Sequence, residues 1–223
     1  MPLPPSVTVL ISGRGSNLIA LHERASGYRI GAVISNNSDA AGLRWAEERG
    51  IPCHTVLRSD FQSLSDFKTA VLQAVIKTSP DLVALAGFMV VLQPAFIDEF
   101  AGRLINIHPS LLPKFPGLDT HKRALEAGEC EHGASVHFVA TGVDTGAIIA
   151  QGKVSVFSSD SPESLAERTL KIEHQLYPWV VSQVVKGEIS LCRDSVEYSD
   201  LVRSEANEKG FILPMKGDYH ERT

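Results

Sequence analysis

The sequence predicts an α/β protein with a doubly wound, mostly parallel sheet in its N-terminal half that continues into a mixed sheet. Two observations carry this prediction. Strand-like and helix-like stretches alternate strictly up to about residue 100, and two consecutive strand candidates joined by a short loop follow in the second half. Strict alternation implies βαβ crossovers, which give a parallel sheet covered by helices on both faces. Two strands joined by a short loop pair antiparallel, so the sheet becomes mixed.

The first strand is predicted at residues 6–12, SVTVLIS, where the β-branched run is typical of a buried strand. A helix at 40–50 ends on Gly50, which suits a C-terminal cap. The remaining elements of the first half are a helix at 17–26, strands at 29–35 and 51–56, a helix at 61–77 and a strand at 81–87.

In the second half, a brief helix at 94–100 begins on a proline, the residue favoured at a first helical position, and a strand follows at 103–108. The two consecutive strand candidates lie at 134–140 and 147–157, on either side of the loop TGVDTG. Two further helices are predicted, at 120–128 and 161–187.

A chain of 223 residues can bury a full core as one domain. We predict a single domain with an N-terminal half at about 6–100, a C-terminal half at about 101–198 and a tail at 199–223. Residues 189–198 are one more strand candidate, and we expect the polar end beyond it to be loosely held.

Composition and charge exclude several classes of protein. The net charge of −5 argues against a surface that coats nucleic acid, because such a surface needs clustered Lys and Arg. The three cysteines lie far apart without a CxxC pair, so neither a disulfide framework nor a zinc site is indicated, and a reducing cytoplasm fits best. No HxxxH or carboxylate cluster suggests any other metal.

No segment of the sequence predicts a membrane partner. The most apolar stretch, residues 82–92, is 11 residues long, well short of the roughly 20 that a membrane helix needs. The N-terminus lacks a basic region followed by a long apolar stretch, so it does not indicate a signal peptide. We expect a cytoplasmic protein.

The motif SGRGSN, residues 12–17, follows the first strand and opens the first helix. Free N–H groups at a helix start favour an anion such as phosphate. As a dinucleotide fingerprint the motif is poor, because Leu18 replaces the third glycine and the next strand ends in Ser35 rather than an acid. The alternative is a tight turn in which Ser16 or Asn17 caps the helix.

Asn106 and His108 are two apart on one strand, so their side chains project to the same face. They stand at the carboxyl end of that strand, where ligands collect in parallel α/β sheets. An imidazole can take a proton from a nucleophile and an amide N–H can bind an oxygen that becomes negative, so the pair suits attack on a carbonyl. The alternative is that both side chains only satisfy loop backbone groups.

For several other polar residues the sequence allows more than one role. Asp144, 36 positions after His108 in a glycine-flanked loop, is either an acid partner of the imidazole or an ordinary turn residue. Glu173 lies on the long helix, where an isolated acid is usually solvated, and His137 can face a site or a packed interior. We interpret five further histidines as surface or loop residues: His22, His54, His121, His132 and His220.

Six segments, in their order and spacing, resemble the folate-dependent formyltransferases. They are SGRGSNL, AGFMVVL, INIHPSLLPKFPGL, EHGASVHFV, GVDTG and IEHQLYP, and the resemblance covers about residues 6 to 190. NIHPSLLP with a downstream Asp-containing loop is specific to this family. SGxGSNL narrows the resemblance to the branch that acts on glycinamide ribonucleotide, with the formyltransferase fold.

The resemblance implies the site residues and the substrates. Asn106, His108 and Asp144 would be catalytic, and 10-formyltetrahydrofolate would be the co-substrate, with no metal. The acceptor, glycinamide ribonucleotide, would be bound by Gly15, Ser16, Asn17 and Glu173. The folate would be bound by Met89, Val90, Val91, Leu92, Asn106, Ala140 and Asp144. The activity would be formyl transfer in purine biosynthesis by a monomer or homodimer.

Three competing functions stay open beside this one. An enzyme that formylates initiator methionyl-tRNA would carry a basic C-terminal domain, which this acidic chain lacks. A formyltetrahydrofolate deformylase would carry an extra N-terminal domain and usually HHSFLP in place of HPSLLP. A non-catalytic nucleotide-binding module would use the SGRGSN turn, but it leaves Asn106 and His108 unexplained.

Overall fold

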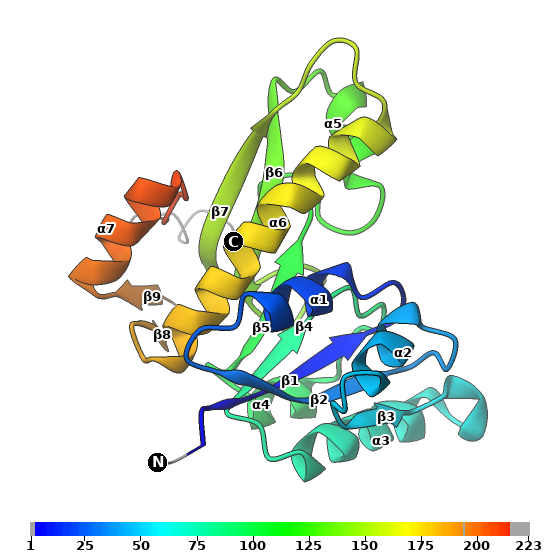
Figure 1. The fold of residues 1–223 in the computed structure, drawn as a ribbon. Helices are drawn as coiled ribbons and strands as arrows, with labels where there is room; N and C mark the ends of the chain where they lie inside the picture. The colour runs from blue at the N-terminus through cyan, green and yellow to red at the C-terminus, as the bar shows by residue number, and fades with distance from the viewer. Residues whose placement is uncertain (1–2, 194, 215–223) are drawn as a thin grey trace. The chain divides into compact units, whose positions relative to one another are not determined.

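The computed structural model describes residues 3–193 and 195–214 (Figure 1). The chain forms two compact units, and the boundary between them in the sequence falls between Ile105 and Asn106. This boundary is close to the expected division near residue 100, while the single domain stays a prediction. We call the two parts unit 1 and unit 2.

Unit 1 is built from alternating strands and helices, as predicted. Strand β1 pairs in parallel with β2 and with β4, and β2 pairs in parallel with β3. The elements are β1 (Ser6–Ile11), α1 (Ser16–Glu23), β2 (Arg29–Ser35), α2 (Ala41–Glu47), β3 (Cys53–Thr55), the short helix η1 (Arg58–Asp60), α3 (Leu64–Lys77), β4 (Leu82–Leu85) and α4 (Pro94–Glu99).

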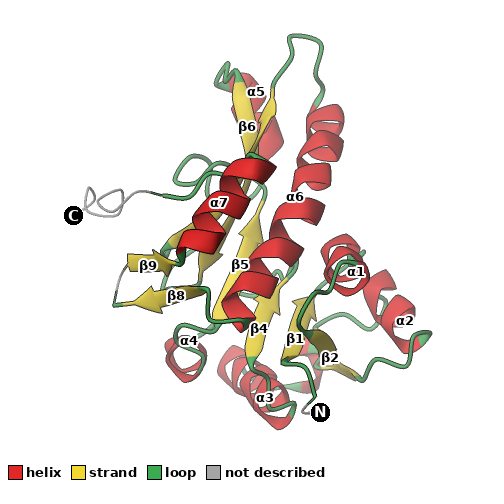
Figure 2. Cartoon of the chain, turned by 60° about the vertical axis from the view of Figure 1, so that its left-hand side comes forward, coloured by secondary structure: helices red, strands yellow, loops and turns green. Residues whose placement is uncertain are grey.

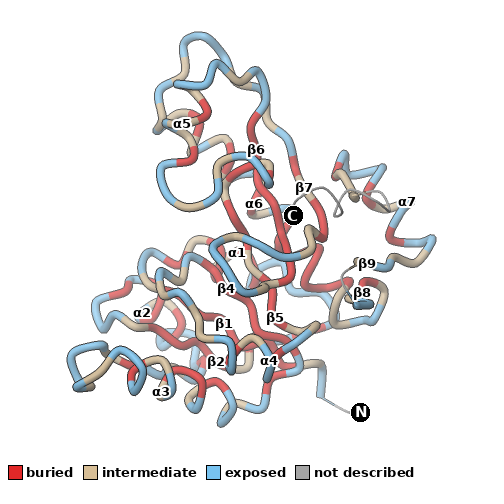
Figure 3. Tube along the Cα trace, turned by 180° about the vertical axis from the view of Figure 1, so that it is seen from behind, coloured by how far each residue is buried: buried red, intermediate tan, exposed pale blue. Residues whose placement is uncertain are grey.

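Helices cover both faces of the strands in unit 1. Helices α1 and α2 lie on one face, and α3 and α4 lie on the other (Figure 1). Right-handed crossovers require this arrangement, because the chain reverses its direction across the sheet after β3. Every residue of β1 and β4 is buried, so these two strands form the core of the unit (Figure 3).

Helix α3 begins later than the sequence predicts. The predicted start is residue 61, but the helix starts at Leu64. Ser63 is in an extended conformation, and its hydroxyl accepts a hydrogen bond from the backbone N–H of Asp66 at 3.0 Å. This N-cap satisfies a backbone donor that the first turn would otherwise leave without a partner, and so it fixes the boundary.

The loop between β1 and α1 lies against the start of α2. Gly15 has a left-handed backbone with φ 75°, and a Cβ built on it would lie 2.7 Å from the Cα of Gly42. The backbone N–H of Gly42 donates to the carbonyl of Gly13 at 3.2 Å. Two facing glycines therefore let this loop and α2 approach more closely than side chains would allow.

Unit 2 carries the antiparallel part of the sheet. Strands β6 and β7 pair antiparallel, which confirms the predicted mixed sheet. The seven strands β1 to β7 form one sheet in the order β3-β2-β1-β4-β5-β6-β7. The elements from the boundary onward are β5 (Leu104–His108), α5 (Thr120–Glu126), β6 (Glu131–Phe138), β7 (Ile148–Ser155), α6 (Pro162–Val185), β8 (Ile189–Cys192), β9 (Ser195–Tyr198) and α7 (Asp200–Lys209).

The prediction of one strand at residues 189–198 is wrong. The segment forms two strands, β8 and β9, which pair antiparallel in a sheet of their own (Figure 2). Arg193, which follows β8, has φ 55°, a left-handed conformation that ends the strand and turns the chain. A polar residue in the middle of the strand candidate therefore marks a turn.

The expectation of a loosely held tail is wrong for the residues after β9. Helix α7 is capped at its start by the hydroxyl of Ser199, which accepts from the N–H of Val202, and it ends on Gly210 with φ 70°. The Trp179 indole donates to the Glu205 carboxylate at 2.9 Å and so fastens α7 to α6. Residues 215–223 lie outside the described part.

Within the described residues, no helix combines the length and the apolar character that crossing a bilayer requires.

We predict that Gly42→Ala destabilises the protein. In an ordinary helix interior this change stabilises by about 0.5–1 kcal/mol, but here the new Cβ would lie 2.6 Å from Ile11 Cδ1 and 3.0 Å from the Cα of Gly15. Overpacking of this kind costs roughly 1–3 kcal/mol. Urea unfolding measures the difference, with Gly13→Ala as the control because a Cβ added there meets nothing within 4 Å. A Gly42→Ala variant as stable as the parent would contradict the close approach.

Candidate active site

Asn106, His108 and Asp144 meet at the end of β5. The Nδ1 atom of His108 lies 3.2 Å from Oδ2 of Asp144, and Nδ2 of Asn106 lies 3.4 Å from Oδ1 of the same carboxylate. His108 is 5% exposed, and the Asp144 side chain is 14% exposed. The structure thus brings together the strand-end pair and the loop acid, although they are far apart in the sequence.

Both ring nitrogens of His108 face oxygen acceptors. Besides the contact of Nδ1 with Asp144, Nε2 lies 2.9 Å from the carbonyl oxygen of Phe115. A neutral imidazole has one N–H and can donate to only one of these oxygens, whereas the cation donates to both. The two oxygens therefore hold this ring in one orientation.

Asp144 also binds the proline-rich segment that follows β5. Its Oδ2 accepts a hydrogen bond from the backbone N–H of Gly117 at 2.8 Å. We call residues 109–117 the proline segment, since it contains Pro109, Pro113 and Pro116. The segment supplies one contact to the imidazole and one to the carboxylate, so its position affects both side chains.

Local backbone geometry turns Asp144 toward the strand end. Asp144 has φ 50°, a left-handed conformation that Asp tolerates better than most residues. At Gly146, with φ 112°, a Cβ would collide with the carbonyl oxygen of Phe138, so only glycine fits. Asp144 is thus a turn residue by its backbone and a partner of the imidazole by its side chain.

His137 faces the site rather than serving only as core packing. Its Nδ1 lies 2.9 Å from the carbonyl oxygen of Phe138, and its Nε2 lies 3.2 Å from Nδ2 of Asn106. Burial lowers the pKa of His137, which favours the neutral ring with its proton on Nδ1. The free Nε2 then accepts from the Asn106 amide, and this fixes which way the amide points.

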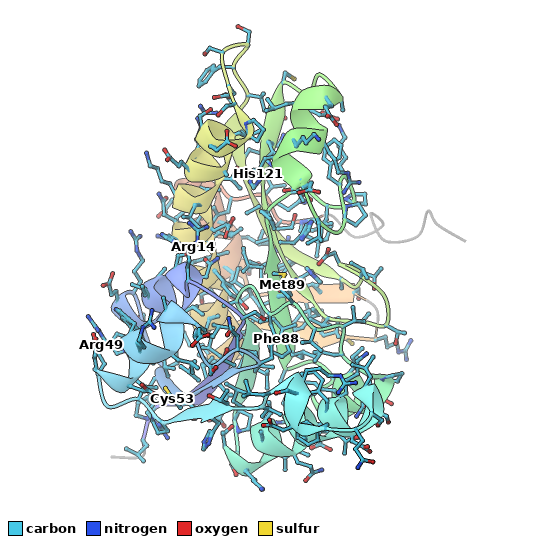
Figure 4. The ribbon with its side chains drawn as sticks, turned by 90° about the vertical axis from the view of Figure 1, so that its right-hand side faces the viewer. Arg14, Arg49, Cys53, Phe88, Met89 and His121 are labelled. Carbon is cyan, nitrogen blue, oxygen red and sulfur yellow. The ribbon has the colours of Figure 1, made fainter. Side chains whose placement is uncertain are left out.

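The loop before α1, in unit 1, leads into a helix start whose N-cap residue makes no side-chain cap hydrogen bond. Helix α1 starts at Ser16, directly after Gly15, and no side chain caps it. The N-cap residue is therefore Gly15 and not Ser16 or Asn17, and the anion site stays a prediction. The backbone N–H groups of the first helical turn point out of the helix start, where they favour a negative group. Arg14 is exposed in this loop (Figure 4).

The segment after β4 is tied to the same loop by Ser12, a residue that the sequence did not single out. The hydroxyl of Ser12 accepts from the backbone N–H of Met89 at 2.9 Å and donates to Oδ1 of Asn36 at 2.6 Å. Met89 and Val91 are 66% and 58% exposed. Exposed apolar side chains above a held backbone can bind a flat, partly apolar ligand.

Glu173 and His132 differ from the interpretation that their sequence context favours. Glu173, on α6, is 7% exposed, so the interpretation as a solvated acid is wrong. His132 is 1% exposed on β6, and its ring lies 5.1 Å from that of His121 on α5, so it is not a surface residue. Burial and then the neighbouring His121 lower the pKa of His132 to about 4. His220 lies outside the described residues.

Comparison with known proteins identifies the family. A family described as "Formyl transferase" matches residues 6–181. The chain belongs to the formyl transferase family. This confirms the predicted family, and the parallel and antiparallel parts of the sheet agree with its fold.

Relatives of this formyl transferase indicate its branch of the family. The chain is 46% identical over 190 residues to the phosphoribosylglycinamide formyltransferase of Escherichia coli, covering 83% of this chain and 90% of that protein. It is 47% identical over 187 residues to the trifunctional purine biosynthetic protein adenosine-3 of Drosophila melanogaster, covering 81% of this chain and 14% of that protein.

A solved structure agrees with both relatives. The phosphoribosylglycinamide formyltransferase of Coxiella burnetii is 43% identical and superposes with a TM-score of 0.84, covering 87% of this chain and 93% of that chain. Formyl transferases use a folate-derived formyl donor, so the family also gives this chain a donor of that class.

We predict that His132 makes the protein less stable as the pH falls from about 6.5 to about 4. In this window the unfolded chain binds a proton that the folded ring resists, and above it both states are neutral. His132→Gln should therefore reduce the slope of unfolding free energy against pH by about one proton. Urea unfolding at several pH values measures the slope, and His54→Gln, at an exposed position of unit 1, is the control. An unchanged slope in His132→Gln would contradict the lowered pKa.

Proposed function

We propose that this formyl transferase moves the formyl group of 10-formyltetrahydrofolate to the amine of glycinamide ribonucleotide, a step of purine biosynthesis. The observation that carries the proposal is the convergence of Asn106, His108 and Asp144 at the end of β5. Family membership and the two relatives named as phosphoribosylglycinamide formyltransferases support the same substrates.

The reaction is direct transfer between two bound substrates. The amine nitrogen attacks the formyl carbon, a tetrahedral intermediate forms, and the bond from that carbon to the folate nitrogen breaks. The amine loses one proton, and the leaving folate nitrogen gains one. Holding the two reactants in line removes roughly 7–11 kcal/mol of the barrier, so the side chains need not supply the whole rate.

Asn106 is the donor to the formyl oxygen as that oxygen becomes negative. Its two amide hydrogens face His137 at 3.2 Å and Asp144 at 3.4 Å. The contact with Asp144 is the longer and weaker one, so it is the one that yields to the formyl oxygen. His137 keeps the amide oriented while this exchange takes place.

His108 moves the proton, and Asp144 holds its ring. The imidazole takes the proton of the attacking amine on Nε2 and delivers it to the leaving nitrogen, while the carboxylate at Nδ1 stabilises the cation. For this step the substrate or a bound water replaces the carbonyl of Phe115 at Nε2. Such proton transfer contributes typically ~10²–10⁴-fold to the rate.

The remaining residues bind the two substrates. Gly15, Ser16 and Asn17 bind the phosphate of glycinamide ribonucleotide, and Glu173 binds close to its amine. The folate takes its contacts from the backbone at Met89, Val90, Val91 and Leu92, and from Ala140 and the Asp144 loop, with Asn106 at the formyl group. The proposed enzyme needs no metal and binds neither nucleic acid nor a membrane. It acts in the cytoplasm as a monomer or a homodimer.

An assay that omits each substrate in turn tests the function. We predict loss of 10-formyltetrahydrofolate only when glycinamide ribonucleotide is present, with formylated product in equal amount. Absorbance of the folate and mass spectrometry of the product measure the two quantities. Loss of the formyl group without the acceptor would favour a hydrolase, and binding of the ribonucleotide with no transfer would favour a nucleotide-binding module.

We predict that His108→Ala lowers kcat by about 10²–10⁴-fold, with far less effect on the KM of either substrate. The ring contributes in the transition state, so its loss affects turnover more than binding. Steady-state kinetics measure both constants, and His54→Ala serves as the control at an exposed histidine.

We predict that Asp144→Asn also lowers kcat far more than it changes the KM of either substrate. The amide oxygen can still accept from Gly117, so the backbone contact survives, but the negative charge that supports a cationic ring is lost. Near-normal turnover in either variant would remove that residue from the proposed mechanism.

A further inference from the structure

Two side chains of the β6–β7 hairpin bind the backbone of Leu112, in the middle of the proline segment. The hydroxyl of Ser135, on β6, accepts from the N–H of Leu112 at 2.9 Å and donates to the carbonyl of Ser110 at 2.6 Å. The side-chain amide of Gln151, on β7, donates to the carbonyl of Leu112 at 2.8 Å. Both polar backbone groups of this buried residue therefore depend on the hairpin.

Gln151 is the residue that joins this set of bonds. Its Nε2 atom carries two hydrogens, and it contacts Ser135 Oγ at 2.7 Å as well as the Leu112 carbonyl. Ser135 thus uses its one donor and both acceptor sites, so no donor remains on its hydroxyl to take over the bond to Leu112. The Leu112 carbonyl would lose its bond if the side chain at 151 lacked an N–H.

The C-terminal segment fixes the backbone of Gln151. The N–H of Gln151 donates to the carbonyl of Ile212 at 2.9 Å, and the N–H of Ile212 donates to the carbonyl of Gln151 at 2.8 Å. Because both backbone groups point toward Ile212, Gln151 and its cross-strand neighbour Ser135 form a non-hydrogen-bonded pair. Side chains are closer in such pairs, which explains how the two reach each other.

The proline segment transmits this support to the proposed active site. The hydroxyl of Ser110 donates to the carbonyl of Lys114 at 2.6 Å, so the segment is closed on itself just beyond Leu112. The next residues provide the Phe115 carbonyl that contacts His108 and the Gly117 N–H that binds Asp144. A shift at Leu112 would therefore displace two contacts of the imidazole and its acid.

We propose that Gln151 is a positioning residue, which holds the proline segment so that Gly117 keeps Asp144 beside His108 and the Phe115 carbonyl keeps the His108 ring in place until the substrate replaces it. This role rests on the proposed function, in which the pair moves a proton. Gln151 itself touches neither the imidazole nor the carboxylate in the described contacts, and it acts through the backbone of Leu112.

Steady-state kinetics of Gln151→Met test the role. Methionine keeps the length of the side chain and removes its N–H donors. We expect kcat to fall by about 10- to 100-fold, since a misplacement of about 1 Å can cost 10² in rate, while KM for both substrates changes little. Gln151→Glu, which places a carboxylate against the Leu112 carbonyl, should give at least the same loss.

The matched control is Tyr28→Phe in unit 1. It removes a bond of the same kind, from a buried side-chain donor to a backbone carbonyl, namely that of Leu21 at 2.8 Å. This variant should lose stability and keep kcat. A Gln151→Met enzyme with the kcat of the parent, or with KM raised as much as kcat is lowered, would overturn the proposal.

Hydrogen exchange read by mass spectrometry separates this inference from the proposed function. In Gln151→Met, amides of residues 110–117 should exchange faster than in the parent, whereas those of β1 should not change; in Tyr28→Phe, residues 110–117 should exchange as in the parent. Unchanged exchange at 110–117 in Gln151→Met would overturn the proposal even for an active enzyme. If the parent enzyme transfers no formyl group, the proposed function fails, and the exchange result still decides whether Gln151 holds the segment.

Discussion

The contacts of the Asp144 carboxylate hold together the part of unit 2 that lies around the end of β5. One oxygen binds His108 and the N–H of Gly117, and the other faces the amide of Asn106. A carboxylate with so little exposed surface is stable only with such donors. The end of β5, the β6–β7 loop and the proline segment therefore all meet at this one side chain.

A second constraint is the series of hydrogen bonds that orients the amide of Asn106. The carbonyl of Phe138 orients His137, the free nitrogen of His137 orients Asn106, and the second hydrogen of the Asn106 amide then faces Asp144. Each step depends on the histidine staying neutral, and burial ensures this by lowering its pKa. A rigid chain of donors and acceptors needs no reorganisation when charge develops, which is the source of most electrostatic catalysis.

Sequence reasoning reached the parts of the site that follow from local periodicity. Asn106 and His108 had to share a face because strand side chains alternate, and the strand is where it was expected. The meeting with Asp144 requires a hairpin, a positive φ and Gly146, none of which spacing reveals, so only the family resemblance supplied it. Helix α7 was missed although Ser199 and Gly210 mark its ends, because its mostly polar surface suggested a solvated tail. Its anchors, Trp179 and Ile212, lie outside local sequence patterns.

The prolines explain why the segment after β5 can serve as a support. Pro109, Pro113 and Pro116 have no backbone N–H, so the segment lacks three of the donors with which a helix or a strand would satisfy its carbonyls. The carbonyls remain available to side chains: that of Leu112 binds Gln151, that of Phe115 binds His108 and that of Pro116 binds Arg123. A regular element would have used these oxygens internally. The prolines that end the strand thus leave carbonyl oxygens that bind Gln151 of the hairpin and the His108 imidazole. The proline segment therefore connects the hairpin to the imidazole.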